Sequence, residues 1–325
     1  MSSSTLQVIQ ELKVASSPAR QLLSRLWDEK PVGAAAALVF LLFVFCGVFA
    51  DWLAPYGFNE ISMLERLKAP SWKHWFGTDN LGRDMLSRCL YGAQLSVIIG
   101  LSAATLATTI SVLIGLICGY IGGKVDMVVQ RIVDAYMSFP ELVILIAVVS
   151  VIGPGMPQII GILSLVLGIG GSRIIRSAVF SARENMYVHA AQSIGASTRR
   201  VLWHHLLPNI MPPIIVLFTT RVGAAILIES GLSFLGLGVP PPAPTWGGLL
   251  SGSGRTYMFQ GPWLALAPGL CLTAVVYATN VFGDALRDLL DPRMRGAKSV
   301  LLPLRKGATL SPFTGLPFTD KETIP

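Results

Sequence analysis

The side chains of this chain most able to do chemistry are two charged residues inside strongly apolar sequence. Arg221 and Glu229 both lie in the apolar run of about residues 213–237. A charge at membrane depth is costly and usually faces protein or water, where it lines a pathway, braces a helix or relays protons. The two residues are eight positions apart, so on a helix they point about 80° apart and no direct ion pair is expected. Glu229 is expected to line a pathway or brace a helix, with proton relay as the alternative.

Other candidate chemistry in the sequence is weak. His204 and His205 are adjacent, so on a helix they point about 100° apart and cannot clamp one metal ion. The stretch Gly122, Gly123 and Lys124 lacks the earlier glycine of a phosphate-binding loop. The four cysteines are scattered without Cys-x-x-Cys spacing, which indicates neither a disulfide framework nor a zinc site. We expect no catalytic residue, cofactor or metal site, and an intramembrane enzyme is only a remote alternative.

The composition is that of a helical membrane protein. Of the 325 residues, 52% are hydrophobic and only 13% are charged, and the mean hydropathy is +0.62. These values exclude an ordinary soluble domain. The net charge of +7 does not indicate nucleic-acid binding, because most basic residues flank apolar runs, as membrane orientation requires. The expected fold class is all-α, a polytopic bundle in the lipid bilayer.

Six apolar runs approach the length of about 20 residues that a spanning helix needs. They cover about residues 32–53, 94–118, 128–152, 157–171, 213–237 and 263–285. The third run is interrupted by Pro140, and the fourth is short and is expected to extend past Arg173. With the N-terminus inside, most Lys and Arg residues fall in the inner segments, so both termini are expected in the cytoplasm.

A polar segment from Tyr187 to Asn209 lies between two apolar runs on the predicted inner side. Four of its residues recur at helical spacing and would leave one face of a short helix almost without bulk: Ala190, Ala191, Ile194 and Gly195. Several arginines surround it, against the single acid Glu184. A basic helix with a small-residue face favours docking of another protein over an ordinary connector.

Two segments on the predicted outer side also carry distinctive residues. Residues 77–84 indicate a turn followed by a helix N-cap at Asp79 or Asn80. Prolines between residues 240 and 244 cannot continue a helix and predict a rigid outer loop. Trp246, just after them, is expected either to anchor at the lipid headgroups or to cap a pathway.

Four of these segments together resemble one family. The pattern Ala190, Ala191 and Gly195, followed by Leu207 and Pro208, resembles the cytoplasmic coupling motif of ABC-importer permeases, although His189 stands where that motif begins with Glu. The outer segment is similar to dipeptide, oligopeptide and nickel-type permeases of the C-type, in the residues Gly77, Asp79, Gly82, Arg83 and Asp84. The stretches 229–247 and 283–293 are similar to the same subfamily, and the resemblance covers about residues 77–296.

The resemblance implies the permease subunit of an ATP-driven importer in the cytoplasmic (inner) membrane of a bacterium or archaeon, with peptides or a similar small solute such as nickel as cargo. Its implied partners are a second homologous permease, two cytoplasmic ATPases and an external solute-binding protein. The implied coupling residues are His189, Ala190, Ala191, Gly195, Leu207 and Pro208. Glu229 and Trp246 are the candidates for the pathway or gate. Residues 77–84 would form a motif at the outer face.

The expected organisation follows from these assignments. Residues 1–30 are expected to be a cytoplasmic segment with an interfacial helix, 31–93 the first span and an outer loop, 94–296 the core permease domain, and 297–325 a disordered cytoplasmic tail. The alternative function is a proton-coupled secondary transporter. No internal repeat is evident, which weighs against that alternative. The cargo itself and the identity of the partner permease are left open.

Overall fold

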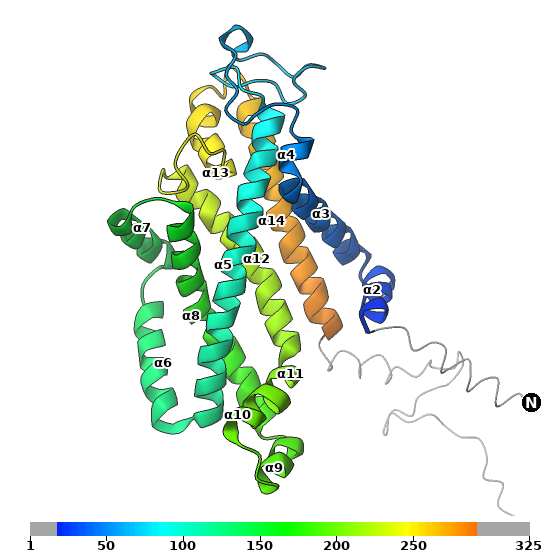
Figure 1. Ribbon diagram of the computed structural model, residues 1–325, viewed down its shortest axis with the longest axis vertical. Helices are drawn as coiled ribbons and strands as arrows, with labels where there is room; N and C mark the ends of the chain where they lie inside the picture. The colour runs from blue at the N-terminus through cyan, green and yellow to red at the C-terminus, as the bar shows by residue number, and fades with distance from the viewer. Residues whose placement is uncertain (1–17, 291–325) are drawn as a thin grey trace, which may run out of the picture.

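The chain folds into an elongated bundle of helices in the computed structural model, which describes residues 18–290 (Figure 1). Within that range, five helices are long and apolar enough to cross a membrane: α3 (Pro31–Val48), α5 (Met85–Ile121), α8 (Met156–Arg183), α12 (Met211–Phe234) and α14 (Trp263–Leu290). A sixth candidate span consists of α6 (Gly123–Met137) and α7 (Glu141–Ile152). The described residues contain no β-strand. The predicted all-α polytopic fold is confirmed.

The third predicted span is broken. Helices α6 and α7 are separated by three residues and bent by 85°. Pro140 lacks a backbone N–H and disfavours a helical conformation at Phe139, so a continuous helix cannot pass through this point. The predicted interruption at Pro140 is therefore confirmed, but the two halves do not form one straight span.

The remaining spans agree with the predicted runs to within about five residues, apart from the start of α5 and the end of α8. Helix α8 extends to Arg183, past Arg173 as expected. Helix α5 begins at Met85, well before the predicted residue 94. Its first turn contains Ser87 and Arg88, which are buried beneath the outer segments. Hydropathy missed these turns because their polar side chains face protein instead of lipid.

Helices α5 and α8 form the most extensive contact of the bundle. Glycines allow this approach: a Cβ atom on Gly115 would lie 2.6 Å from the Cβ of Ile175, and one on Gly168 would lie 2.9 Å from the Cβ of Ile110. Apolar burial gives little driving force between helices in lipid, so close packing through small residues holds membrane bundles together. Helices α3 and α12 pack against α5 in turn.

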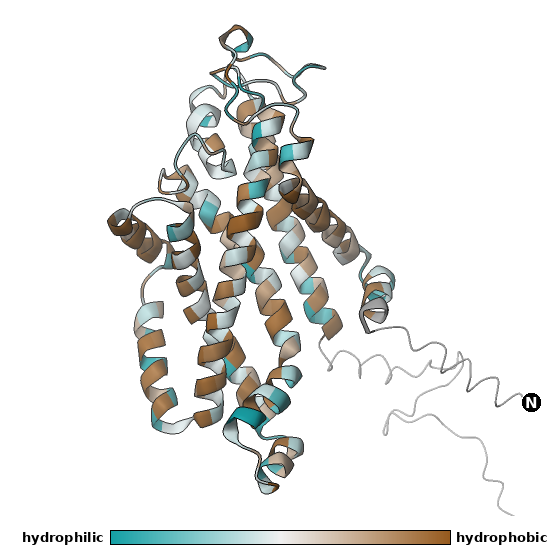
Figure 2. Ribbon diagram, viewed as in Figure 1, coloured by the Kyte–Doolittle hydropathy of each residue, from teal (hydrophilic) through white to brown (hydrophobic). Residues whose placement is uncertain are grey.

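The polar segments gather at the two ends of the bundle (Figure 2). One end carries the predicted outer loop with the 3₁₀ turn η1 (Met63–Glu65) and, next to it, α13 (Trp246–Leu249) and η3 (Leu250–Gly254). The opposite end carries α9 (Met186–Ser193), α10 (Thr198–Arg200), η2 (Val201–Leu206) and α11 (Leu207–Asn209). The short helix α2 (Pro18–Glu29) and the end of α14 lie near the start of α3. Lys30, the residue between α2 and α3, forms an ion pair of 2.6 Å with Asp288 of α14. The predicted tail 297–325 lies outside the described residues.

Candidate functional site

Helix α9 lies at one extreme end of the molecule and ends in a defined glycine stop (Figure 1). The N–H of Ala196 donates to the carbonyl of Ala191 at 3.0 Å, and the N–H of Gly195 donates to Gln192 at 2.9 Å. These two bonds form a Schellman motif, whose residue after the cap adopts a left-handed conformation. Gly195 is that residue, with φ of +80°. The chain can turn back sharply after α9 because a glycine stands there.

The predicted small face of this helix is therefore corrected. Gly195 lies beyond the end of α9 and does not continue its face. Val188 is buried in a cluster with Val179 of α8, and Ala191 is buried as well. His189 and Ala190 are exposed, so Ala190 faces away from the bundle whereas Ala191 faces it. Spacing alone could not show which alanine faces the bundle.

The segment after α9 anchors itself by apolar side chains and leaves basic ones outside. Val201 and Leu206 of η2 are buried in the same cluster as Val188. Leu207 is half-buried and Pro208 is exposed. An open depression beside them is lined by Ser197, Arg199, Arg200, Trp203 and His204. The structure thus brings the predicted coupling residues together at one end of the bundle, with a basic surface beside them.

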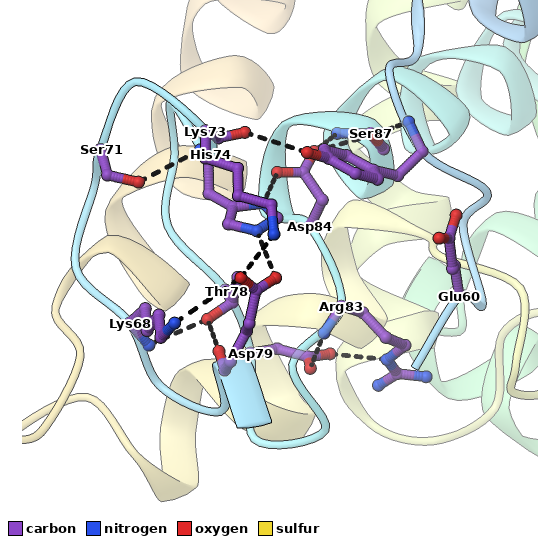
Figure 3. A network of polar contacts seen from close by, with 12 residues as sticks. Glu60, Lys68, Ser71, Lys73, His74, Thr78, Asp79, Arg83, Asp84 and Ser87 are labelled. Carbon is purple, nitrogen blue, oxygen red and sulfur yellow. Dashed lines mark hydrogen bonds and ion pairs between the residues drawn. The ribbon is translucent and has the colours of Figure 1, made fainter. Parts of the chain in front are cut away.

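At the opposite end, Asp79 and Asp84 organise the outer segment (Figure 3). Asp79 is fully buried and accepts bonds from the backbone N–H groups of Leu81 and Arg83, at 2.8 and 3.0 Å. The Nε of Arg83 donates to the second carboxylate oxygen of Asp79 at 2.7 Å. Asp84 accepts the N–H of Ser87 at 2.8 Å and caps α5. The N-cap is therefore Asp84, not Asp79 or Asn80, because Asp79 is used to close the preceding turn.

Both glycines of this segment allow a close approach that a side chain would prevent. Gly82 has φ of +74°, and a Cβ atom on it would lie 1.8 Å from the carbonyl oxygen of Ser62. Gly77 has φ of +71°, and its Cβ would lie 2.7 Å from the indole nitrogen of Trp263. That nitrogen donates to the carbonyl of Thr78 at 3.1 Å. The outer motif is thus locked onto the start of α14.

His74 connects two parts of the same outer loop, and the sequence did not single it out. Its Nδ1 lies 2.9 Å from Asp84 (Figure 3). Its Nε2 lies 2.8 Å from Glu65. Lys73 donates to the other oxygen of Glu65 at 2.6 Å. The hydrogen bonds from Lys73 and then His74 lower the pKa of Glu65 to about 2. The three residues belong to an irregular loop, where no periodic pattern could have shown that they meet.

Glu229 is enclosed by the chain's own packing. Its side chain is fully buried in α12. The hydroxyl of Ser233 donates to one carboxylate oxygen at 2.6 Å, and that of Ser230 to the other at 3.3 Å. None of the ion pairs found among residues 18–290 joins Glu229 to Arg221, as the spacing of the two residues predicts. Of the two roles expected for Glu229, bracing within the bundle fits this burial and lining an open pathway does not.

Trp246 is buried as well, at the start of α13. Its indole nitrogen donates to the carbonyl of Cys89 in α5 at 3.0 Å. Its ring lies 5.7 Å from that of Phe43 in α3, and a Cβ atom on Gly92 would lie 2.7 Å from it. The indole therefore ties three helices together. Because the indole is buried within the chain, it does not lie at the surface where a headgroup anchor is expected. Its role as a gate stays a prediction.

A multi-span bundle with a short helix held out at one polar end has the architecture of a membrane transport subunit. Residues 111–296 match the family described as "Binding-protein-dependent transport system inner membrane component". The chain belongs to this family. It is therefore a multi-pass inner-membrane permease subunit, a class of protein that transports and is not itself an enzyme.

Individual relatives agree with this assignment. The dipeptide transport system permease protein DppC of Alkalihalophilus pseudofirmus is 39% identical over 86% of this chain and 92% of its own length. The glutathione transport system permease protein GsiD of Escherichia coli is 38% identical over 84% of this chain and 90% of its own. A probable peptide ABC transporter permease protein, y4tQ of Sinorhizobium fredii, is 44% identical over 71% of this chain and 79% of its own.

One solved structure shares the fold. The inward-facing MetNI methionine ABC transporter contains a chain that aligns with a TM-score of 0.51 and 18% identity. The alignment covers 64% of this chain and 98% of that chain. At this identity the likeness shows a common arrangement of helices and nothing about cargo.

Proposed function

We propose that the chain is one of two permease subunits in an ATP-driven importer of peptides or a similar small solute. The other subunits are a second homologous permease, two cytoplasmic ATPases that hydrolyse ATP, and an external solute-binding protein. The names of the relatives support peptide cargo, since they describe dipeptide, glutathione and peptide systems. None of these names mentions nickel, so peptides are the cargo we favour.

The observation that carries this proposal is the division of α9 into an anchored side and a free side. Val188 packs into a buried cluster with α8 and holds the helix on the bundle, and Ala191 is buried on the same side. Met186 and Ile194 are 88% and 86% exposed at the extreme end of the molecule. Met186 begins α9 and Ile194 caps its end, so both can contact a protein that approaches the free side of the helix. We propose that this side of α9, with His189, contacts an ATPase, and that residues 196–209 pass its movement to α8 and α12.

The proposed orientation puts α9 and both termini in the cytoplasm and the His74 loop outside. The excess of Lys and Arg in the segments at the α9 end supports it. Glu60 and Ser193 are exposed residues at the two ends. In a variant without native cysteines, Glu60→Cys should react with an impermeant thiol reagent only from outside, and Ser193→Cys only from the cytoplasm. The reverse pattern would contradict the orientation and, with it, the ATPase contact.

Docking through α9 is tested by placing a charge on its free side. Ile194→Glu removes no buried contact, because this side chain is already exposed, so the chain should insert and fold. The variant should co-purify poorly with the ATPases and lose ATP-dependent uptake in proteoliposomes. Leu64→Glu is the matched control, since Leu64 is 93% exposed at the opposite end. Normal ATPase recovery with Ile194→Glu would exclude this face as the dock.

A proton-coupled secondary transporter is the competing function, with Glu229 or Asp134 as the coupling group. Its distinguishing property is uptake that needs a pH gradient and no ATPase subunits. Uptake measured with ATP and the pH gradient varied independently separates the two functions. We expect dependence on ATP alone.

A further inference from the structure

A polar cavity of about 380 Å³ lies at the break between α6 and α7, where these helices meet α8 and α12. Its polar groups come from three helices: Tyr136 of α6, Glu141 of α7 and Arg221 of α12. The remaining side chains of the lining are apolar, and Gly170 of α8 contributes only its backbone. The guanidinium of Arg221 lies directly over this side, since a Cβ atom on Gly171 would be 3.4 Å from its Nη2. The two glycines therefore leave space in the cavity beside the guanidinium of Arg221.

The charges that face this cavity form no direct ion pair among residues 18–290, whereas their neighbours do. Among residues 18–290, Arg221 and Glu141 take part in none of the ion pairs. The Nε of Arg221 and the hydroxyl of Tyr136 are buried without any hydrogen-bond partner in the described chain. Nearby, Arg173 and Arg176 of α8 are each bonded to an aspartate of α6. The fold thus satisfies the surrounding charges and leaves one of each sign at the helix break.

Unpaired charges within spanning segments require a reason. A buried polar group without a partner costs free energy, and a charge costs more. Interrupted helices at membrane depth are tolerated where they line a cavity, and transporters place their cargo sites at such breaks. Ionisable residues inside a membrane protein commonly mark the pathway of its substrate. The buried Nε of Arg221 and the hydroxyl of Tyr136 carry this cost, whereas Glu141 is exposed. All three groups are thus open to a ligand.

We propose that this cavity is a binding site for a short zwitterionic peptide on its way through the chain. The guanidinium of Arg221 holds the peptide carboxylate, a geometry for which its planar fork is suited. Glu141 holds the terminal ammonium, and Tyr136 bonds a peptide group between the two. The apolar remainder of the wall accepts small side chains, and the volume lies within the range of about 300–1,000 Å³ usual for ligand sites. The proposal rests on peptides being the cargo.

The site can be tested on the purified complete complex, in the absence of the solute-binding protein, with trialanine as the probe. Met137 lines the cavity and is partly exposed, so Met137→Cys in a variant without native cysteines reports occupancy by its rate of alkylation. Millimolar trialanine should slow alkylation several-fold. Trialanine that is acetylated at its N-terminus and amidated at its C-terminus has lost both charges and should not protect.

Substitutions in the cavity should abolish protection selectively. Arg221→Gln and Glu141→Gln should each weaken protection about tenfold or more, which corresponds to about 1.4 kcal/mol. Arg221→Lys keeps the positive charge and should retain part of the protection. Arg131→Gln is the matched control, because Arg131 lies on α6 but does not line the cavity. Unchanged recovery of the ATPases and unchanged alkylation without peptide show that each variant is folded.

The outcomes separate this site from the proposed function. Equal protection by charged and capped peptides would overturn recognition of the termini. Absence of protection in a complex that still imports peptide would overturn the site and leave the importer function intact. Failure of the complex to import any peptide, with the ATPases bound, would instead contradict the cargo on which the site rests.

Discussion

The ring nitrogen Nε2 of His74 lies 2.8 Å from a carboxylate oxygen of Glu65 in the outer loop. The opposite ring nitrogen lies 2.9 Å from Asp84, the residue that caps α5. The imidazole therefore connects the loop around η1 to the start of a spanning helix. The ring of Tyr56 lies 5.0 Å from that of His74 and is tilted to it by 34°. His74 is buried and therefore lies at the centre of a folded layer at this end of the bundle.

This arrangement predicts that the stability of the loop around His74 decreases at acidic pH. The pKa of Glu65 falls to about 2 in the folded protein from an ordinary value of 4.5. A lowered carboxyl pKa gives stability that is complete above the ordinary value and is lost as the pH falls toward the folded one. Protection of residues 54–84 from proteolysis should decline between about pH 4.5 and pH 2. In Glu65→Gln this part of the decline should be absent, while Glu184→Gln at the other end should match the wild type.

Gly195 allows its two possible roles to be separated by side-chain size. A left-handed conformation costs a residue with a Cβ about 1–2 kcal/mol, and asparagine tolerates it best. No atom lies within 4 Å of a Cβ built on Gly195, so the isolated chain has room for either side chain. If the helix stop is what matters, Gly195→Asn should keep hydrogen-exchange protection of α9 and ATPase binding better than Gly195→Ala. If close contact with the ATPase matters, the smaller alanine should be the better tolerated.

Glu229 is expected to act as a brace, and two substitutions test this role. Glu229→Gln keeps an oxygen that can accept the bond from Ser233, so ATP-dependent uptake should survive with a modest defect. Glu229→Leu leaves both serine hydroxyls without this acceptor and should cost about 1–3 kcal/mol of stability. Thermal unfolding and uptake should therefore rank wild type, Gln and Leu in that order. Loss of uptake in Gln equal to that in Leu, together with dependence on a pH gradient, would instead indicate proton relay.

Sequence periodicity and composition predicted the spans but not the contacts between irregular segments. The break at Pro140 was predictable because proline has a local steric effect. The early start of α5 was not, because Ser87 and Arg88 are polar and their burial depends on the folded outer loop. The cavity at Arg221 and Glu141 combines residues from different helices. Arg221 is recognisable in the sequence as a costly charge. The residues that it faces depend on the 85° bend between α6 and α7, which the sequence does not show.

The close contact of α5 and α8 gives a prediction with an internal control. A valine at Gly115 would force a Cβ to within 2.6 Å of the Cβ of Ile175, on backbones that cannot easily separate. Overpacking of this kind typically costs about 1–3 kcal/mol.

Gly161→Val places the same side chain on α8, at a position where no atom lies within 4 Å of the new Cβ. Both variants replace a helical glycine by valine, so their change in helix propensity is alike and only the packing differs. The purified chain with Gly115→Val should unfold at a clearly lower temperature than wild type in detergent, and Gly161→Val should stay close to wild type. Equal melting temperatures in the two variants would mean that the glycine contact does not hold α5 and α8 together.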